Sequence, residues 1–254
     1  MQGILTIAKN TFRETIRDKV LYVILAFAVL IIISTIFFGS ISLDQDIKVI
    51  KDLGLSGIFL FGIIIAIFVG TNLVHKELDK RTVFLIFSKP IPKYEFVLGK
   101  FLGIASTLFL VTFAMTAVFI GILALKKADL EPVLLEAIAW GYLEFLVIAA
   151  ISIMFSALTS PIASTIYTIC LFIIGHASNS LVYLISQTES KTWIAILKAI
   201  HYIIPNFEKF NIRNSAIVGI GISGEQILYT ILYALAYMIL ALAIANFFLK
   251  KQEF

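Results

Sequence analysis

The stretch KELDKRTVFLIFSKPIPKYEFVLGK, Lys76 to Lys100, places nine charged residues among 25 and lies between two long apolar runs. The run before it, residues 54–74, and the run after it, residues 101–125, contain no Asp, Glu, Lys or Arg. A helix needs about 20 apolar residues to cross the hydrocarbon core of a bilayer. The charged stretch, residues 75–100, is therefore predicted to be a loop between two membrane-spanning helices.

The rest of the chain repeats this pattern. The 254 residues are 60% hydrophobic and 14% charged, whereas a soluble domain has about 25% charged residues. Four further apolar runs cover residues 20–38, 133–158, 161–185 and 226–249. The sequence therefore predicts an all-α membrane protein, built as one transmembrane domain of six helices, and leaves little room for a soluble domain.

The first 19 residues are predicted to form an amphipathic helix. Its apolar face comprises Leu5, Ala8, Phe12 and Ile16. Its basic stripe, at a spacing of four, comprises Lys9, Arg13 and Arg17. Such a helix can lie in the headgroup layer before the chain enters the bilayer. The alternative is a solvated helix whose cations only set the topology.

The distribution of basic residues predicts the orientation. If the N-terminus is cytoplasmic, the same side of the membrane holds twelve of the 20 Lys and Arg residues. This excess has the direction that the positive-inside rule requires. We therefore expect a multi-pass protein of the cell membrane (plasma or inner membrane) with both termini in the cytoplasm.

Residues 186–225, on the external side, are too long and too apolar for a simple loop. Within them Lys191–Ile204 places Trp193, Ile196, Leu197, Ile200 and Ile204 along one helical face. A helix of this length is too short to span, so we expect it to lie in the interface or to enter the membrane and return. Pro205 ends it, and irregular structure is predicted for the residues that follow.

The charged loop also has an unusual internal order. The helix of the second span is predicted to continue to Arg81, and the prolines of Lys89-Pro90-Ile91-Pro92 then force a break. The next helix begins before the third span, with Glu95 and Lys100 predicted to be exposed. Apolar residues rimmed by charge usually mark a contact surface. The alternative is a plain polar hairpin loop.

This order resembles the permease subunits of type-2 ATP-binding-cassette exporters. Their pattern is a Glu after the second span, a Thr five residues later, an apolar run, a Pro-containing turn and a closing Leu-Gly-Lys. The chain supplies Glu77, Thr82, Val83–Phe87, Ser88–Pro92 and Leu98-Gly99-Lys100. It departs from the family at Arg81, where the usual residue is glycine.

The resemblance implies that the loop docks onto a separate ATPase subunit, that residues 1–19 are the elbow helix, and that a second permease copy or a paralogue completes a dimer in the lipid bilayer. The implied coupling residues are Glu77, Arg81, Thr82, Phe84, Phe87, Lys89, Pro90 and Pro92. ATP and magnesium are expected on the partner. In the sequence itself the only Gly-Lys pair, Gly99-Lys100, is followed by Phe101 and does not complete a phosphate-binding loop. We therefore expect no catalytic, cofactor or metal site on this chain, and no nucleic-acid partner.

Polar residues inside the predicted spans are the other candidates. Glu144 lies near the middle of the fourth span and Glu136 nearer its external end; His176 lies in the fifth span, with Asn179 close behind. Intramembrane ionisable residues often mark a substrate or proton pathway, and Glu144, His176 and Asn179 are the candidates for one. The alternative is structural: a protonated Glu144 hydrogen-bonded across a helix interface, with Glu136 near the headgroups.

Two other functions stay open at this stage. One is a membrane-embedded, lipid-modifying enzyme with Glu144 and His176 as acid and base. The other is a membrane anchor that transmits force from an ATPase without transporting anything. The transported substrate is not encoded in any motif that the sequence shows, because apolar residues that face lipid and apolar residues that face substrate look alike.

Overall fold

A computed structural model describes residues 2–41, 45–79, 92–217 and 224–251 of the chain. Within these ranges the chain forms helices and no strand, which confirms the predicted all-α fold. The helices are α1 (Gln2–Ile16), α2 (Lys19–Ile41), α3 (Asp46–Asp79), α5 (Lys93–Leu125), α6 (Pro132–Leu158), α7 (Pro161–His176), α8 (Ser178–Gln187), α9 (Lys191–Ile203), the 3-10 helix η1 (Phe207–Phe210), α10 (Arg213–Ile217) and α11 (Gly224–Lys251).

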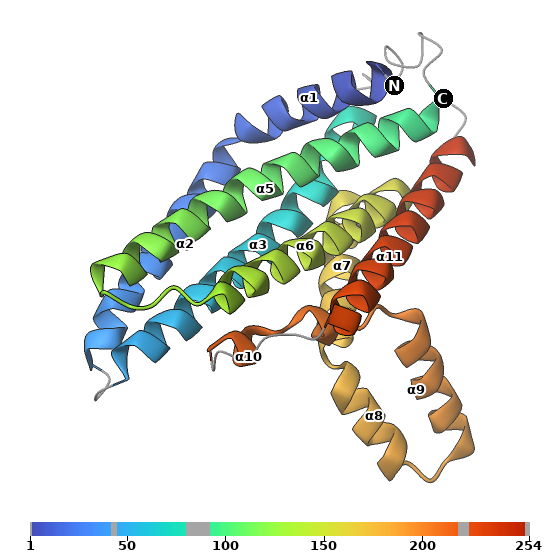
Figure 1. Cartoon of the computed structure of the whole chain (residues 1–254). Coiled ribbons are helices and arrows are strands. Elements are labelled where there is room, and N and C mark those ends of the chain that lie inside the picture. The colour runs from blue at the N-terminus through green and yellow to red at the C-terminus, as the bar shows by residue number, and fades with distance from the viewer. Residues whose placement is uncertain (1, 42–44, 80–91, 218–223, 252–254) are drawn as a thin grey trace.

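Five helices, α2, α3, α5, α6 and α11, are each long and apolar enough to cross a membrane. The bent pair α7 and α8 gives a sixth span if it is counted as one. Successive long helices run in alternating directions (Figure 1), so that α1 begins and α11 ends at the same end of the bundle, which we call the terminal end. The α8–α9 hairpin projects from the opposite, distal end (Figure 1).

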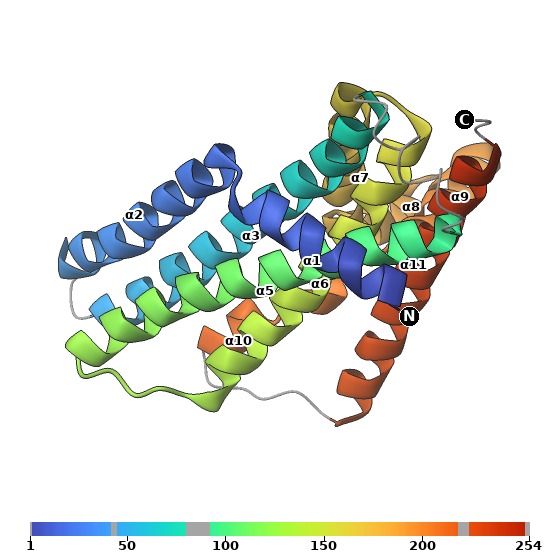
Figure 2. The ribbon, with the colours of Figure 1, turned by 90° about the horizontal axis from the view of Figure 1, so that it is seen from above.

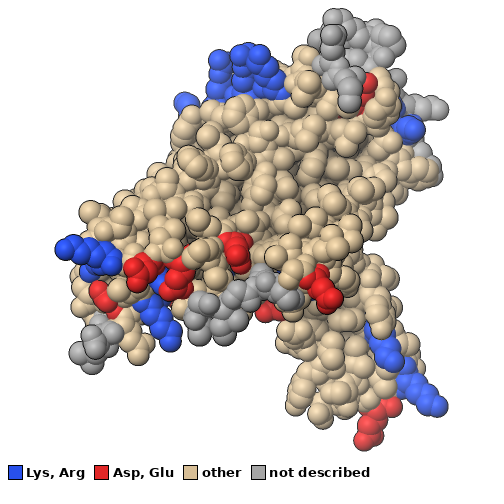
Figure 3. Space-filling model, viewed as in Figure 1, with Lys and Arg blue, Asp and Glu red and all other residues tan. Residues whose placement is uncertain are grey.

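Charged side chains gather toward the two ends of the bundle, and a broad band without charge separates them on the face shown in Figure 3. At the distal end, two charged residues of α3 pair with residues of the connection between α5 and α6. Lys51 Nζ lies 2.9 Å from Glu131 Oε1, and Lys126 Nζ lies 3.7 Å from Asp46 Oδ2. The band is the part of the molecule suited to the hydrocarbon core, where backbone groups must be satisfied within helices.

The centre of the bundle is the pair α3 and α6, which pack through reciprocal glycine–phenylalanine contacts. A Cβ atom added at Gly62 would lie 2.2 Å from the Phe145 ring, and one added at Gly141 would lie 2.6 Å from the Phe59 ring. The two rings meet edge to face, with centroids 6.0 Å apart. Small residues that allow close backbone approach are the usual basis of helix association in lipid. Outside this pair, α2 and α11 cover the bundle and are mostly exposed (Figure 2).

The predicted extent of the first external loop, residues 39–53, is wrong, because α2 ends at Ile41 and α3 begins at Asp46. The first two turns of α3 carry Asp46 and Lys51, whose charges are neutralised by the ion pairs with Lys126 and Glu131. The position of charged residues therefore does not show where α3 begins.

Helix α1 packs against α5 along one side. Thr11 and Thr15 are buried against α5, whereas Leu5 is 68% exposed. The basic stripe of α1 is exposed, as predicted; α1 therefore contacts protein along one side and leaves its cations on another.

The fifth span is not one straight helix, as residues 161–185 were predicted to be. It ends as α7 at His176, and α8 continues from Ser178 at a bend of 63°. The residues at the bend include Gly175, Ser178 and Asn179, which are poor helix formers. Gly175 also lies against the carbonyl oxygen of Pro205, 2.5 Å from where its Cβ would stand.

The external segment is partly as predicted. The expected helix over Lys191–Ile204 is α9, which pairs with α8 and has no buried residue. The irregular structure predicted after Pro205 is wrong, because this segment forms the short helices η1 and α10, and Phe207 and Phe210 are completely buried. Residues 207–217 therefore return into the protein, against α3, α6 and α7.

Candidate functional site

Glu144 lies at the centre of the molecule. It is the thirteenth of the 27 residues of α6, and its side chain is 1% exposed. Its Oε1 atom lies 2.8 Å from Nε2 of His176, the last residue of α7. The tight turn at Thr159 and Ser160 makes α6 and α7 antiparallel neighbours, and this brings together two residues that are 32 positions apart in the chain.

The contact extends into a larger group that we call the polar cluster: Glu144, His176, Glu208, Asn211 and Arg213. His176 Nδ1 lies 3.6 Å from Glu208 Oε2, and Asn211 Nδ2 donates to Glu208 Oε1 at 3.3 Å. Arg213 Nε donates to Asn211 Oδ1 at 3.1 Å. The cluster thus joins α6 and α7 to the returning segment of η1 and α10.

Arg213 connects the polar cluster to α3. Its Nη1 atom donates to Ser56 Oγ at 3.3 Å, and its guanidinium carbon lies 5.1 Å from the centre of the Phe59 ring. A guanidinium group over an aromatic face is a cation–π contact. Arg213 therefore has two neutral acceptors and one ring around it.

A cavity of about 340 Å³ lies beside the cluster. Its walls are mostly apolar and come from α3, α6, α7 and the returning segment: Ser56, Phe59, Leu60, Ile63, Glu144, Phe172, Ile173, His176, Asn211 and Arg213. Leu60 and Ile173, at its rim, are 55% and 58% exposed. The cavity therefore opens on the outer side of the bundle. An apolar pocket with a few convergent polar groups is the usual form of a small-molecule site.

Against known families, the model described as ABC-2 family transporter protein matches residues 5–253. The chain belongs to this family. It is a permease subunit of an ATP-binding-cassette transporter and a multi-pass membrane protein, and membership implies association with an ATPase subunit of that class. No individual curated protein matches the chain.

The family match indicates that the Glu144–His176 contact belongs to a transporter. The distance of 2.8 Å would suit proton transfer between an acid and a base. In a permease, the same arrangement provides polar groups at the middle of a membrane-spanning bundle, where they are costly unless they serve a function or a specific contact.

At the terminal end of the permease, α1 lies along the first half of α5. A Cβ added at Gly99 would lie 2.7 Å from Ile7 Cβ, and one added at Gly103 would lie 2.6 Å from Thr11 Cβ. Lys100 was predicted to be exposed, and this is wrong: it is 1% exposed, and its Nζ lies 3.9 Å from Glu14 Oε2. The Leu-Gly-Lys motif therefore forms a contact between α5 and α1, which we call the α1–α5 joint.

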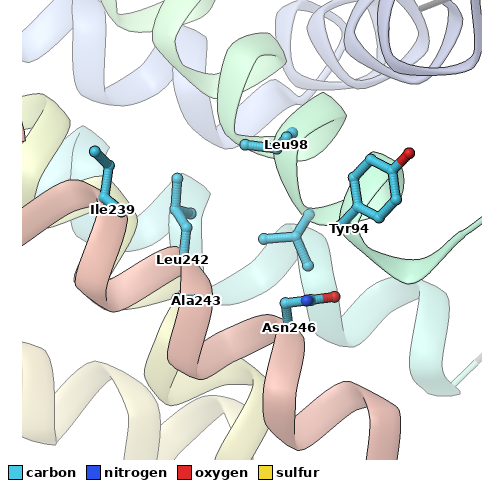
Figure 4. Close-up of a pocket in the computed structure, with 7 residues that line it drawn as sticks. Tyr94, Leu98, Ile239, Leu242, Ala243 and Asn246 are labelled. Carbon is cyan, nitrogen blue, oxygen red and sulfur yellow. The ribbon is translucent and has the colours of Figure 1, made fainter.

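A second, smaller hollow of about 190 Å³ lies near the joint, between the start of α5 and the end of α11 (Figure 4). Its lining residues are Tyr94, Val97, Leu98, Ile239, Leu242, Ala243 and Asn246. Close to it, Lys93 Nζ donates to the carbonyl oxygen of Leu249 at 2.9 Å. A cation at the C-terminal end of a helix satisfies a free carbonyl, so the last turn of α11 is held by the first residue of α5.

The structure brings together only some of the predicted site residues. Glu144 and His176 are in contact, as described above, but Asn179 is exposed on α8 and does not line the cavity. Pro92 has an extended backbone and directly precedes α5, in agreement with the predicted break. The other coupling residues lie outside the described residues or, for Glu77, have no described side chain: Glu77, Arg81, Thr82, Phe84, Phe87, Lys89 and Pro90.

Three residues of the cluster, Glu208, Asn211 and Arg213, were not predicted. They lie in a segment that the sequence assigned to the external side. A signal was present, because Phe207 and Phe210 stand three residues apart, as do Glu208 and Asn211. In a helical turn this spacing places the two Phe residues on one side and Glu208 and Asn211 on another. Such a pattern is unusual for a solvated loop.

Proposed function

We propose that the permease is the membrane subunit of an exporter, driven by ATP hydrolysis on a separate subunit, and that its substrate passes the cavity beside Glu144. The observation that carries the proposal is the family match over residues 5–253 together with an open, mostly apolar cavity that is lined by the buried Glu144 near the middle of α6. ATP, magnesium and the hydrolytic residues belong to the partner in this proposal, in which two permease subunits form a dimer with both termini in the cytoplasm.

The coupling surface in this proposal lies in the charged stretch, residues 75–100. Phe84 and Phe87 act as anchors, because aromatic residues dominate the energy of many interfaces. Glu77, Arg81 and Lys89 form the rim, where charge affects encounter more than affinity. Thr82, Pro90 and Pro92 complete the surface, and the prolines limit the backbone motion that would absorb a push from the ATPase.

The α1–α5 joint supports this assignment. Because Gly99 and Gly103 allow close contact with α1, the two helices are suited to move as one body. A displacement of the loop would then reach α5 at its first residue and α1 through the joint. The proposal therefore assigns the Leu-Gly-Lys motif to transmission of the motion and not to contact with the ATPase.

The experiment is a pull-down of the candidate ATPase with permease variants in lipid nanodiscs, together with measurement of ATP hydrolysis. Replacement of both Phe84 and Phe87 by alanine is expected to weaken binding by at least about tenfold, as for loss of interface anchors. The matched control replaces Phe37 and Phe38, an exposed adjacent pair on α2 at the distal end, and should bind as the parent does.

A second variant separates binding from coupling. Replacing Pro90 and Pro92 by alanine should leave most of the binding but lower the stimulation of ATP hydrolysis by the permease. If the double-Phe and double-Pro variants bind and stimulate like the parent, the loop is not the coupling surface. Turnover of a lipid by the isolated permease would instead support the enzyme hypothesis.

A further inference from the structure

We propose that the cavity beside the polar cluster binds amphipathic organic cations, with a protonated amine at Glu144 and the apolar part between α3 and α7. The inference rests on the proposed function only in regarding the bound compound as cargo. Binding itself is a property of this chain and is measured without an ATPase.

The first observation is a carboxyl oxygen without a partner on Glu144, a residue that lines the cavity. Glu144 Oε1 contacts His176, but Oε2 has no hydrogen-bond partner among the residues that the structure describes, although the side chain is 1% exposed. A buried polar atom without a partner is destabilising, and native proteins contain few of them. A ligand that donates a hydrogen bond to Oε2 would supply the missing partner.

The second observation is the charge around the cavity. Two carboxyl groups, on Glu144 and Glu208, flank the His176 ring. The guanidinium group of Arg213 already has the Ser56 hydroxyl, the Asn211 carbonyl and the Phe59 ring near it. The unmet requirement is therefore a donor at Glu144. An ammonium group offers three donors and a positive charge, and charge-assisted hydrogen bonds are stronger than neutral ones.

The third observation is the shape and polarity of the remaining wall. Phe59, Ile63 and Phe172 line the interior, and the exposed side chains of Leu60 and Ile173 form the rim. A cavity of about 340 Å³ is near the lower limit of roughly 300–1,000 Å³ for small-molecule sites. It therefore suits the head and the first part of a hydrocarbon chain, while the rest of the chain extends through the rim into lipid.

The test compares three probes that share a dodecyl chain and differ in the head group: dodecylamine, dodecanol and dodecanoate. Equilibrium dialysis of each radiolabelled probe is measured against the purified permease in nanodiscs, with empty nanodiscs subtracted. Saturable binding of dodecylamine is expected. Glu144→Gln should weaken it by about tenfold or more, as expected for loss of a charge-assisted bond at a buried site. Glu136→Gln, at an exposed position of the same helix, should leave it unchanged.

A second pair of variants tests the cavity without changing its charge. Ile173→Trp at the rim should lower the affinity for dodecylamine by obstructing entry. Ile174→Trp, on the same helix and outside the lining, should not. Both positions are exposed in the structure, so neither variant disturbs the core.

Three results would overturn the inference: no saturable binding of the amine, equal binding of dodecanol with the same dependence on Glu144, or preferred binding of dodecanoate that is lost in Arg213→Gln. The outcome of the ATPase pull-down does not depend on the outcome of this binding assay. A permease that binds dodecylamine but no ATPase contradicts the proposed function alone, and one that binds the ATPase but no amine contradicts only this inference.

Discussion

The α1–α5 joint gives the sharpest prediction, because one helix offers both the test position and its control. Gly103→Ala places a methyl group 2.6 Å from Thr11 Cβ and 2.8 Å from the carbonyl oxygen of Ala8. Non-bonded carbon atoms prefer a separation of roughly 3.5–4.0 Å. The backbone carbonyl of Ala8 cannot rotate away as a side chain can. The added methyl group therefore forces α1 to move away from α5.

The magnitude follows from two opposing effects. Overpacking of a tight contact costs about 1–3 kcal/mol. Alanine is favoured over glycine in a helix by up to about 1 kcal/mol. Gly121 is in the same helix and has no atom within 4 Å of an added Cβ, so Gly121→Ala should be neutral or stabilising. The free energies of unfolding of the two variants should therefore differ by about 1–3 kcal/mol, with Gly103→Ala the less stable.

The assay combines global and local measurements on the purified permease. Thermal unfolding in one detergent compares stability. The labelling rate of Thr15→Cys by a water-soluble maleimide, after replacement of Cys170, reports locally on α1, because Thr15 is 3% exposed in the joint. Labelling should be faster with Gly103→Ala and unchanged with Gly121→Ala. Equal stability of the two glycine variants, with Thr15→Cys unreactive in both, would refute the tight joint.

Three further predictions concern the rest of the molecule. Phe207→Ala should destabilise the permease by about 3–5 kcal/mol in thermal unfolding, because the Phe207 ring is fully buried. Phe247→Ala, at a position 53% exposed, should change the stability little. Similar melting temperatures of the two variants would show that η1 does not anchor the returning segment. Ser156→Ala removes a hydrogen bond of 3.0 Å to the carbonyl oxygen of Thr71 and should cost about 0.6–1.7 kcal/mol by the same measurement; a gain in stability would contradict it. In intact cells an impermeant maleimide should label Glu189→Cys but not Arg13→Cys, and the reverse pattern would contradict the proposed orientation.

The spans could be predicted from the sequence, five as single long helices and the sixth as the bent pair α7 and α8, because an uncharged run of spanning length has few other stable structures. Helix ends were less predictable. Asp46 and Lys51 belong to α3 because their charges are paired with Lys126 and Glu131 across the distal end. Such pairs join residues about 80 positions apart, so no local pattern shows whether a charged residue ends a helix or starts one.

The site was predictable only in part for a related reason. Glu144 stood out because a carboxyl group is costly in the middle of an apolar run, and the turn at Thr159 and Ser160 made a contact with α7 plausible. The rest of the polar cluster depends on residues 207–217 returning into the bundle. Glu208 and Arg213 look like ordinary external residues in the sequence, and only packing against Ser56 and His176 reveals them.

Helix α3 links the two parts of the molecule that the proposals use. It carries Ser56, Phe59, Leu60 and Ile63 along the cavity and continues to Asp79, where the charged loop follows. From Ile63 to Asp79 an unbroken helix spans about 24 Å. Helix α3 packs tightly against α6 at glycine positions. One end of α3 therefore cannot shift without the other unless the contacts between α3 and α6 separate. A cation bound at Glu144 should therefore change the ATP hydrolysis of the assembled transporter, and Glu144→Gln should abolish that change.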